Sequence, residues 1–406
     1  MKRLLFAAPA VPRPTGSGVQ MRGWMFLQGL VRRYAVTLVV GSPGFPEARA
    51  LDLQRLRGLV QQIIALDFRR DPFVRVRSLA RRVGLRMAPC WDWAEPTPPM
   101  RRQLSRLHEC AFDRAHVFRL NMLPVTLAVL AGRPLPALDL DLDDWESETR
   151  LALSRLAGSN QPALHRRYAE EATALAEYER TWLPRVSRLF VAAETDVQAI
   201  AGRHGLATVV AVGNSVEVPS VQPPPLECDP ADLLFVGGLG YLPNHHGVEF
   251  LLDNVMPAFS AGAVRLTVAG AKPPPSLRRR LFGPGRRWIE APERVEALYA
   301  RAQVALAPIH AGGGTRIKAL EAFARGRPLI ATRAAVAGLD VEENRHYLAA
   351  ETPGEWIEAI RALLARRDLR DRIAKAAFEW VGRHSLTRGI EQVEALADGA
   401  EGPRVP

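Results

Sequence analysis

Short apolar runs alternate with stretches of helical periodicity along almost the whole sequence. An apolar run without polar alternation, bounded by turn residues and followed by a helix, is typical of a parallel strand covered by helices on both faces. The pattern therefore predicts an α/β fold built from doubly wound, Rossmann-like units. We expect the strands at residues 3–8, 35–40, 62–66, 115–118, 138–142, 189–193, 208–212, 233–236, 265–269, 288–291, 304–307, 328–331 and 346–348.

A proline-rich stretch divides the sequence into two parts of similar size. VPSVQPPPLECDPAD, residues 218–232, has five prolines and no periodicity, as expected of a domain linker. Two doubly wound domains joined in this way create a cleft between the carboxyl ends of their sheets, where ligands of open α/β folds bind. We expect a first Rossmann-like domain at 1–217, a linker at 218–231, a second Rossmann-like domain at 232–385 and, at 386–406, a C-terminal helix and tail that would pack back on the first domain.

Composition fits a globular protein with two cores and excludes several other classes. The chain has 406 residues, of which 48% are apolar and 24% are charged. Its cysteines, Cys90, Cys110 and Cys228, lie far apart without CxxC or Cys/His spacing, which argues against a disulfide framework or a zinc site and fits a reducing cytosol. MKRLLFAAPAVPRP imitates a signal peptide, but its apolar run is short, so we interpret it as a buried strand in a cytoplasmic protein.

The net charge of +11 includes one dense basic segment. RRDPFVRVRSLARRVGLRM, residues 69–87, interleaves seven arginines with apolar residues. Arg69–Arg86 could lie on an anionic membrane surface at its inner face, or it could be the solvated face of a helix, and both interpretations stay open. We expect no nucleic-acid partner, because aromatic interleaving and a recognisable nucleic-acid module are both missing.

The first predicted strand is followed by a glycine turn that enters a helix. Gly16, Ser17 and Gly18 precede a helical stretch that carries Arg22. Glycines at a helix N-terminus bring backbone N–H groups close to an anion. The GxGxxG pattern of nicotinamide-binding proteins fails here, because position 21 is Met. We place these four residues among the candidates for the first-domain side of the cleft.

A second glycine turn follows the predicted strand at 233–236. Gly237 and Gly238 let the backbone approach a ligand or adopt positive φ. No GKS or GKT follows, so the turn is not a P-loop. A plain βα turn and a ligand-facing loop are equally compatible with it.

The densest chemical signal is HAGGGTRIKALEAFARGRPLIAT, residues 310–332. A strand runs into glycines, Thr315 is a natural N-cap, and Gly326 followed by Pro328 ends the helix. Arg316 and Lys318 fall in the first helical turn, where the helix dipole disfavours each cation by about 0.3–1 kcal/mol. Two cations at that end indicate a bound anion, and together with the glycines they describe a diphosphate cradle. The glycines are Gly312, Gly313 and Gly314.

A carboxylate follows on the same helical face. Glu321 lies three residues after Lys318, where it could accept hydrogen bonds from vicinal hydroxyls such as those of a ribose. A plain Lys/Glu surface pair would leave the three glycines and Arg316 unexplained.

The acidic run LDLDLDDWESETR, residues 138–150, offers a different hypothesis. Its DxD spacing resembles that of sugar transferases in which carboxylates hold Mn²⁺ or Mg²⁺ on a nucleoside diphosphate. The basic cradle already neutralises phosphate without a metal, so we expect no metal and favour strand-end aspartates that face the cleft. The further cleft candidates are Arg119, Asp143, Asp144 and Asn214. We interpret the lone His116 as structural.

Several segments resemble the family-4 glycosyltransferases of the GT-B fold, of the bacterial polysaccharide-biosynthesis type. FVGGLGYLPNHHGVEFLLDNVMP, YARAQVALAPIHAGGGTRIKALEAFARGRPLIAT and GLDVEENRHYLAAETPGEWIEAI are similar to the donor half of these enzymes. SRLFVAAETDVQAI and VGNSVEVP resemble the segment that precedes their linker.

The resemblance implies a retaining, metal-independent transfer of a hexose-type sugar from a nucleoside-diphosphate sugar to a glycan or lipid-linked acceptor in envelope or exopolysaccharide biosynthesis. It implies that Arg316 and Lys318 bind the pyrophosphate and that Glu321 binds the ribose. Gly16 and Gly18 would approach the transferred sugar or the acceptor. The family often has a glutamate where this sequence has Gly313, so the identity of the sugar does not follow.

Two other functions fit the same architecture. One is an epimerase-like or phosphorylase enzyme acting on a nucleotide sugar or glucan, although a phosphorylase would need a cofactor-bound lysine and the chain has only Lys2, Lys272, Lys318 and Lys375. The other is a non-catalytic nucleotide-sugar-binding scaffold, which the intact Arg/Lys/Glu set argues against.

Overall fold

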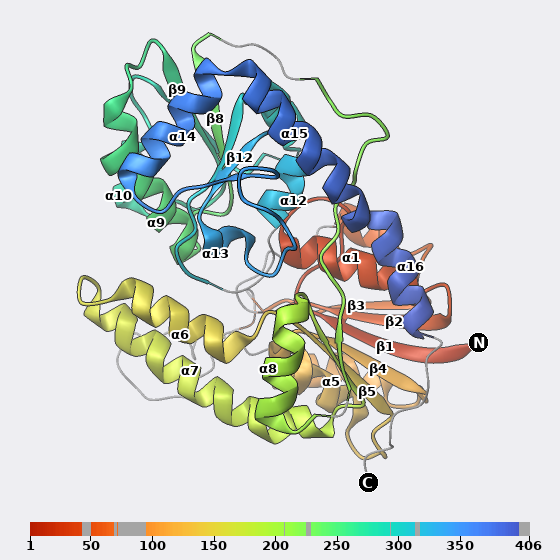
Figure 1. Ribbon diagram of the computed structural model, residues 1–406. Coiled ribbons are helices and arrows are strands. Elements are labelled where there is room, and N and C mark those ends of the chain that lie inside the picture. Colours follow the sequence, from red (N-terminus) through yellow and green to blue (C-terminus); the bar gives the residue numbers. More distant parts are fainter. Residues whose placement is uncertain are drawn as a thin grey trace.

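Two parallel sheets, each covered by helices on both faces, form the protein (Figure 1). The computed structural model describes residues 1–42, 50–68, 71, 95–206, 208–224, 229–292, 294–312 and 317–397. The first sheet has seven strands in the order β3-β2-β1-β4-β5-β6-β7. They are β1 (Lys2–Ala8), β2 (Tyr34–Val40), β3 (Gln62–Ala65), β4 (Arg114–Phe118), β5 (Ala137–Asp143), β6 (Arg188–Val191) and β7 (Val209–Ala211).

The second sheet has six strands in the order β10-β9-β8-β11-β12-β13. They are β8 (Ala231–Val236), β9 (Val264–Ala269), β10 (Arg286–Ile289), β11 (Val304–Ala307), β12 (Leu329–Ala331) and β13 (Leu348–Ala349). Each strand predicted from the sequence is present, with ends that shift by up to two residues. The predicted α/β class with two Rossmann-like units is therefore confirmed.

The helices, in chain order, connect these strands on either side of the sheets. They are α1 (Gly18–Leu30), α2 (Ala50–Leu56), α4 (Pro98–Leu104), α5 (Leu123–Leu130), α6 (Glu146–Ala157), α7 (Pro162–Trp182), α8 (Glu194–His204), α9 (Leu242–Phe250), α10 (Pro275–Arg280), α11 (Glu296–Arg301), α12 (Ile317–Ala324), α13 (Arg333–Val336), α14 (Pro353–Ala365), α15 (Arg367–Val381) and α16 (Leu386–Ala397). In the described ranges, no helix combines the length and the apolar character that crossing a bilayer requires.

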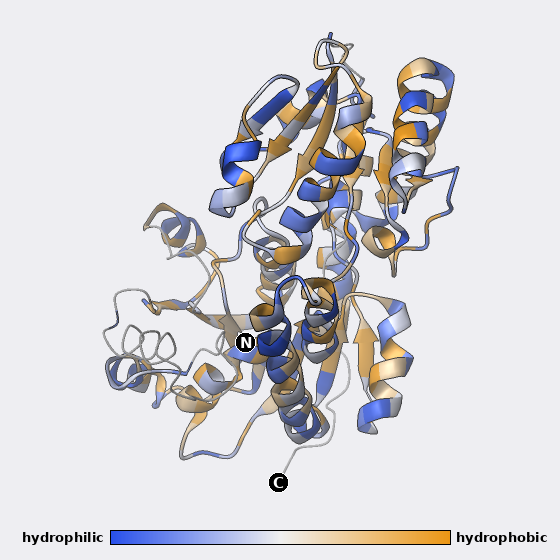
Figure 2. Cartoon of the chain, turned by 90° about the vertical axis from the view of Figure 1, so that its left-hand side faces the viewer, coloured by the Kyte–Doolittle hydropathy of each residue, from blue (hydrophilic) through white to orange (hydrophobic). Residues whose placement is uncertain are grey.

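Each sheet separates two apolar layers, which explains why its strands read as continuous apolar runs. In β1, Leu5 packs into the cluster on one face of the sheet, whereas Leu4 and Phe6 pack into the cluster on the other. The strands are correspondingly hydrophobic in Figure 2. Helices on both faces bury both sets of side chains, so the strands lack the alternation of apolar and polar residues that is typical of a half-exposed strand.

The last helix returns to the first domain (Figure 1), where α16 packs against α1. The two helices approach closely because each carries a glycine at the contact. A methyl group on Gly29 would lie 2.7 Å from Val393, and one on Gly389 would lie 2.5 Å from the Met25 sulfur. The Tyr34 hydroxyl also donates a hydrogen bond of 3.1 Å to the Ala397 carbonyl at the end of α16.

The linker is held to the second domain by one buried arginine. Arg327 is fully buried, and its Nη2 donates hydrogen bonds of 2.9 and 2.7 Å to the carbonyls of Pro223 and Pro224. Proline carbonyls are good acceptors, and prolines have no N–H to satisfy, so a guanidinium suits this segment.

Candidate functional site

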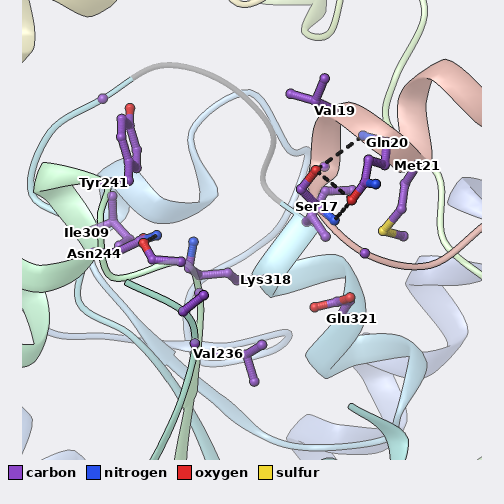
Figure 3. Close-up of a pocket in the computed structure, with 18 of the residues that line it drawn as sticks. Ser17, Val19, Gln20, Met21, Val236, Tyr241, Asn244, Ile309, Lys318 and Glu321 are labelled. Carbon is purple, nitrogen blue, oxygen red and sulfur yellow. Dashed lines mark hydrogen bonds between the residues drawn. The ribbon is translucent and has the colours of Figure 1, made fainter. Parts of the chain in front are cut away.

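A cavity of about 920 Å³ lies between the two domains and is lined by both. The first domain contributes the turn between β1 and α1, together with residues that follow β4 and β5. The second contributes the turn after β8 and the start of α12. Figure 3 shows Lys318, Glu321 and Tyr241 around this cavity with the start of α1. Its position at the carboxyl ends of the strands is where ligands of open α/β sheets bind.

Lys318 and Glu321 reach the cavity from α12, whose opposite face is anchored in the core. Leu320 and Phe323 are fully buried on that face. Gly326 adopts φ +63°, and its N–H donates to the Phe323 carbonyl at 2.9 Å, so it ends the helix as the sequence predicts. The helix therefore presents the predicted cation and carboxylate on one side.

Gly237 leaves room for the Lys318 side chain. A methyl group on Gly237 would lie 2.8 Å from Lys318 Cε and 3.0 Å from Asn244 Nδ2, closer than carbon and nitrogen atoms pack. A methyl group on Gly238 would meet nothing within 4 Å. Of the two readings of this turn, the close approach at Gly237 favours a loop that shapes the cavity.

Burial disfavours the charged forms of both Lys318 and Glu321. It lowers the pKa of Lys318 to about 8, although Glu321 opposes this shift. It raises the pKa of Glu321 to about 7, although Lys318 and Arg325 oppose that shift, and Tyr299 makes a hydrogen bond to the carboxylate. An ammonium group that has lost its water and faces a cavity is stabilised when an anion binds beside it.

The start of α1 lines the same cavity with backbone donors. Ser17 caps the helix: its Oγ accepts from the Gln20 N–H at 3.4 Å, and the Gln20 side chain accepts from the Ser17 N–H at 3.1 Å. The N–H groups of Gly18 and Val19, in the first turn, have no intrahelical acceptor. Gly16, at φ +129°, makes the turn into this helix, a conformation that favours glycine. This end of α1 can bind negative charge.

Arg22 does not lie where the sequence analysis places it. It is 1% exposed and does not line the cavity. Its Nη2 donates to Asp141 at 2.8 Å, and its Nη1 donates to the Val212 carbonyl at 2.7 Å and to Asn214 Oδ1 at 3.2 Å. Asn214 and Asp143, which we also expected at the cleft, are buried with it and do not line the cavity. The physical reason is that Arg22 lies one turn inside α1, on the face that packs against the sheet.

The aspartates of the DxD pattern are counter-ions of buried arginines. Asp139 accepts from Arg114 at 2.6 Å and from Arg188 at 2.5 Å, while Asp141 pairs with Arg22. They point into the sheet core and not to the cleft, because they lie within β5 and not beyond its end. Among the described residues, no group of His, Cys, Asp and Glu side chains is arranged to hold a metal ion.

Arg119 and Asp144 do line the cavity. Arg119 follows β4 with φ 66°, and it donates to Asp143 Oδ2 at 2.7 Å; Asp143 ends β5 with φ 58°. Burial by itself would lower the pKa of Arg119, but Asp143, Glu146 and Asp144 raise it, so the guanidinium stays charged. Two neighbouring non-glycine residues in the left-handed region mark a place where tertiary contacts override backbone preference.

Some predicted residues lie outside the described residues. They are Gly313, Gly314, Thr315 and Arg316 of the cradle, and nearly all of the basic segment Arg69–Arg86. Gly312 is described: it lines the cavity with φ +115°, and a methyl group on it would lie 2.8 Å from the Tyr241 hydroxyl.

The cavity also contains residues that the sequence analysis missed. Tyr241 and Asn244 follow the glycine turn after β8, and Asn244 Nδ2 donates to the Gly238 carbonyl at 2.8 Å. Glu146 is the first residue of α6, within the acidic run 138–150, and Tyr168 lies on α7. Adjacency to a strand end could have indicated the first three. His116, by contrast, is buried between the rings of Phe6 and Phe26, which confirms a structural role.

Comparisons with known proteins agree with this architecture. Residues 230–366 match the family model of the glycosyl transferases group 1. Sucrose-phosphate synthase from Thermosynechococcus elongatus is 13% identical with a TM-score of 0.66, over 98% of each chain. The chain has the GT-B fold. Anabaena HepE in complex with UDP and glucose is also 13% identical, with a TM-score of 0.64, over 98% of this chain and 100% of that one.

A third solved structure, WaaG, a glycosyltransferase involved in lipopolysaccharide biosynthesis, is 14% identical with a TM-score of 0.64, over 98% of this chain and 100% of that one. No curated protein sequence matches the chain. Together the family model over residues 230–366 and the GT-B neighbours support a glycosyltransferase of the GT-B type.

Proposed function

We propose that this protein is a retaining glycosyltransferase of family 4 that transfers a hexose-type sugar from a nucleoside-diphosphate sugar to a glycan or lipid-linked acceptor. The observation that carries the proposal is that Lys318 and Glu321 both line the cavity from α12, together with the start of α1 from the first domain. One cation with a lowered pKa and one helix N-terminus then converge on the same space. The Lys318 ammonium and the N-terminus of α1 both create positive potential, which favours the binding of a diphosphate group.

The second domain would bind the donor. Lys318 would contact the diphosphate, and Glu321 would accept hydrogen bonds from the ribose hydroxyls, with Arg316 as a further phosphate ligand. As the bond to the sugar breaks, negative charge grows on the leaving phosphate, and a cation already in place stabilises that charge without reorganisation. We expect the transfer to need no metal ion. HepE, which has the same fold, has been solved with UDP-glucose, so UDP sugars are the first donors to test.

The resemblance to family-4 glycosyltransferases also supports a proposal for the pathway and the cellular location. We propose a cytoplasmic enzyme of envelope or exopolysaccharide biosynthesis, associated peripherally with an anionic membrane surface through Arg69–Arg86. WaaG, which has the same fold, acts in lipopolysaccharide biosynthesis.

Nucleotide binding tests the proposal most simply. UDP, GDP and ADP are added separately, and the melting temperature is followed; at least one of them should raise it, because a ligand that binds only the folded state stabilises it. Lys318→Ala should abolish the increase. If none of the three nucleotides changes the melting temperature of the unmodified protein, the donor site is misassigned.

Product analysis then separates the enzyme classes. The donors to test are the nucleotide sugars that contain the diphosphate found to raise the melting temperature. A transferase forms a new glycoside from such a donor or slowly hydrolyses it, whereas an epimerase returns an isomeric nucleotide sugar. The anomeric configuration of the product, read by NMR, decides between retention and inversion. Activity that disappears with EDTA and returns with Mn²⁺ would contradict the metal-free mechanism.

A further inference from the structure

The Glu321 carboxylate faces the cavity, and a tyrosine that does not reach the cavity contacts it from behind. Tyr299 lies on α11, is 2% exposed and does not line the cavity. Its ring belongs to the apolar cluster that also contains Leu320 and Phe323 of α12. Its hydroxyl donates a hydrogen bond to the Glu321 carboxylate. The ring of Tyr299 is therefore fixed in the core, while its polar end contacts a group that faces the ligand space.

Tyr299 can act only as a donor to this carboxylate. Burial raises the pKa of Tyr299 well above its usual value, and the charge of Glu321 acts in the same direction, although Arg325 opposes it. The hydroxyl therefore stays protonated. An ionised carboxylate only accepts hydrogen bonds, so the contact with Tyr299 stabilises the ionised form of Glu321, which burial disfavours.

The charged neighbours of Glu321 do not hold its side chain in one orientation. Lys318 lies one turn before it and Arg325 one turn after it, and both lower the pKa of Glu321, whereas Glu296 raises it. Among these described residues, neither cation makes an ion pair with Glu321, and Arg325 instead contacts Glu296 at 3.3 Å. A hydrogen bond is directional, so the contact with Tyr299 orients the carboxylate as well as favouring its charge.

Orientation matters because a ribose presents two vicinal hydroxyls in fixed directions. A carboxylate has lone pairs for about four donors, so one bond from Tyr299 leaves acceptors free for both hydroxyls. A glutamate side chain has several rotatable bonds, and a side chain that is already held in its binding orientation loses less conformational freedom when the ligand arrives. The contact between Tyr299 and Glu321 therefore favours ribose binding.

We infer that Tyr299 is a positioning residue of the donor site: its hydrogen bond orients the Glu321 carboxylate toward the vicinal hydroxyls of a ribonucleotide, and so it strengthens the preference for ribose over deoxyribose without contacting the ligand. The inference rests on the proposed function, which assigns the ribose to Glu321. It adds that a residue of α11, buried in the core of the second domain, controls this selectivity.

Ligands that differ by one hydroxyl test the inference. Calorimetry at pH 7 compares the diphosphate that stabilises the protein with its 2′-deoxy and 3′-deoxy forms. The unmodified protein should bind at least one deoxy form about tenfold or more weakly, because a charged hydrogen bond is lost. Tyr299→Phe keeps the packed ring and should reduce this preference by about threefold or more. The ligands share base and diphosphate, so contacts to those groups cancel in the comparison.

Tyr34→Phe is the matched control. It also removes the hydroxyl of a buried tyrosine, but in the first domain, where that hydroxyl donates to the Ala397 carbonyl at 3.1 Å. It should leave the preference for ribose unchanged. The same preference in the Tyr299 and Tyr34 variants would overturn the inference.

Glu321→Ala separates positioning from a general effect on packing. Tyr299 acts through Glu321, so Tyr299→Phe should weaken binding of the ribonucleotide in the otherwise unmodified protein and should have no further effect in the Glu321→Ala background. Equal weakening in both backgrounds would show that Tyr299 supports the site only through packing, which also overturns the inference.

The same measurements keep the two proposals apart. If no diphosphate binds, the proposed function fails. If a diphosphate binds without any preference for ribose, the assignment of the ribose to Glu321 fails, and the inference about Tyr299 fails with it. If the preference exists and Tyr299→Phe retains it in full, only the inference about Tyr299 fails.

Discussion

Both halves of the protein place a basic residue on the helix that follows a glycine turn, and they use it in opposite ways. In the first domain, Arg22 is 1% exposed, and Asp141 accepts hydrogen bonds from both its Nε and its Nη2. In the second, Lys318 reaches the cavity, and burial lowers its pKa to about 8 despite nearby Glu321. Arg22, whose partners all lie within the fold, stabilises it, whereas Lys318, which makes no ion pair with another described residue, is available to a ligand.

The largest effect is expected when Arg22 is removed from its buried ion pair with Asp141. Arg22→Met leaves the Asp141 carboxylate buried without its cation, and breaking such a pair costs about 3–5 kcal/mol of unfolding free energy. Burial raises the pKa of Asp141, and Arg22 opposes that shift. Removal of Arg22 should therefore raise the pKa of Asp141 further. A carboxyl whose pKa is higher in the folded state favours folding at low pH, so the variant should lose stability as the pH rises from 5 to 8.

Denaturant unfolding at both pH values measures this effect. Arg32→Met is the control, because Arg32 pairs with Glu394 on the surface at 47% exposure, and it should cost less than about 1 kcal/mol. Equal losses in the two variants would contradict a structural role for the Arg22 pair.

If Lys318 binds the diphosphate, nucleotide affinity should depend on the protonation of its side chain and therefore on pH. A diphosphate binds the ammonium form, whose pKa in the free protein is about 8. Affinity should therefore fall as the pH rises through 8, approaching tenfold per pH unit well above it. Calorimetry at pH 7, 8 and 9 measures the fall.

Lys318→Arg is the matched variant for that experiment, since a guanidinium stays protonated over this range. It should bind with little pH dependence between 7 and 9. An unmodified protein whose affinity is the same at pH 7 and 9 would show that Lys318 does not contact the diphosphate.

The smallest expected effect comes from the glycine turn that makes room for Lys318. Gly237→Ala would bring a methyl group to 2.8 Å from Lys318 Cε, so the lysine must move, and diphosphate affinity should fall several-fold. Gly262→Ala adds the same methyl group to open space away from the cavity and should bind as the unmodified protein does. The idea fails if the two alanine variants have the same affinity.

Local patterns in the sequence were sufficient for the elements and for the α12 residues. Apolar runs predicted the strands, and Gly326 and the spacing of Lys318 and Glu321 predicted the end of α12 and its cavity-facing side. These features depend on residues that lie a few positions apart, so a sequence displays them directly.

Pairings between distant residues were not predictable in this way. The spacing of Asp139 and Asp141 resembles a metal site, but their partners, Arg114, Arg188 and Arg22, lie 25 or more positions away. Tyr168 reaches the cavity only because α6 and α7 pack together as a pair, so its position in the sequence carries no signal. Such contacts are set by tertiary packing and by long-range charge pairing.

The central claim is that Lys318 binds the diphosphate and not the nucleoside. The direct measurement compares the Kd of UDP, or of whichever diphosphate stabilises the protein, with that of its nucleoside, for the unmodified protein and for Lys318→Met. We predict that the variant loses at least tenfold in diphosphate affinity, about 1.4 kcal/mol or more, and binds the nucleoside unchanged. Equal loss for both ligands, or loss for neither, would contradict the account.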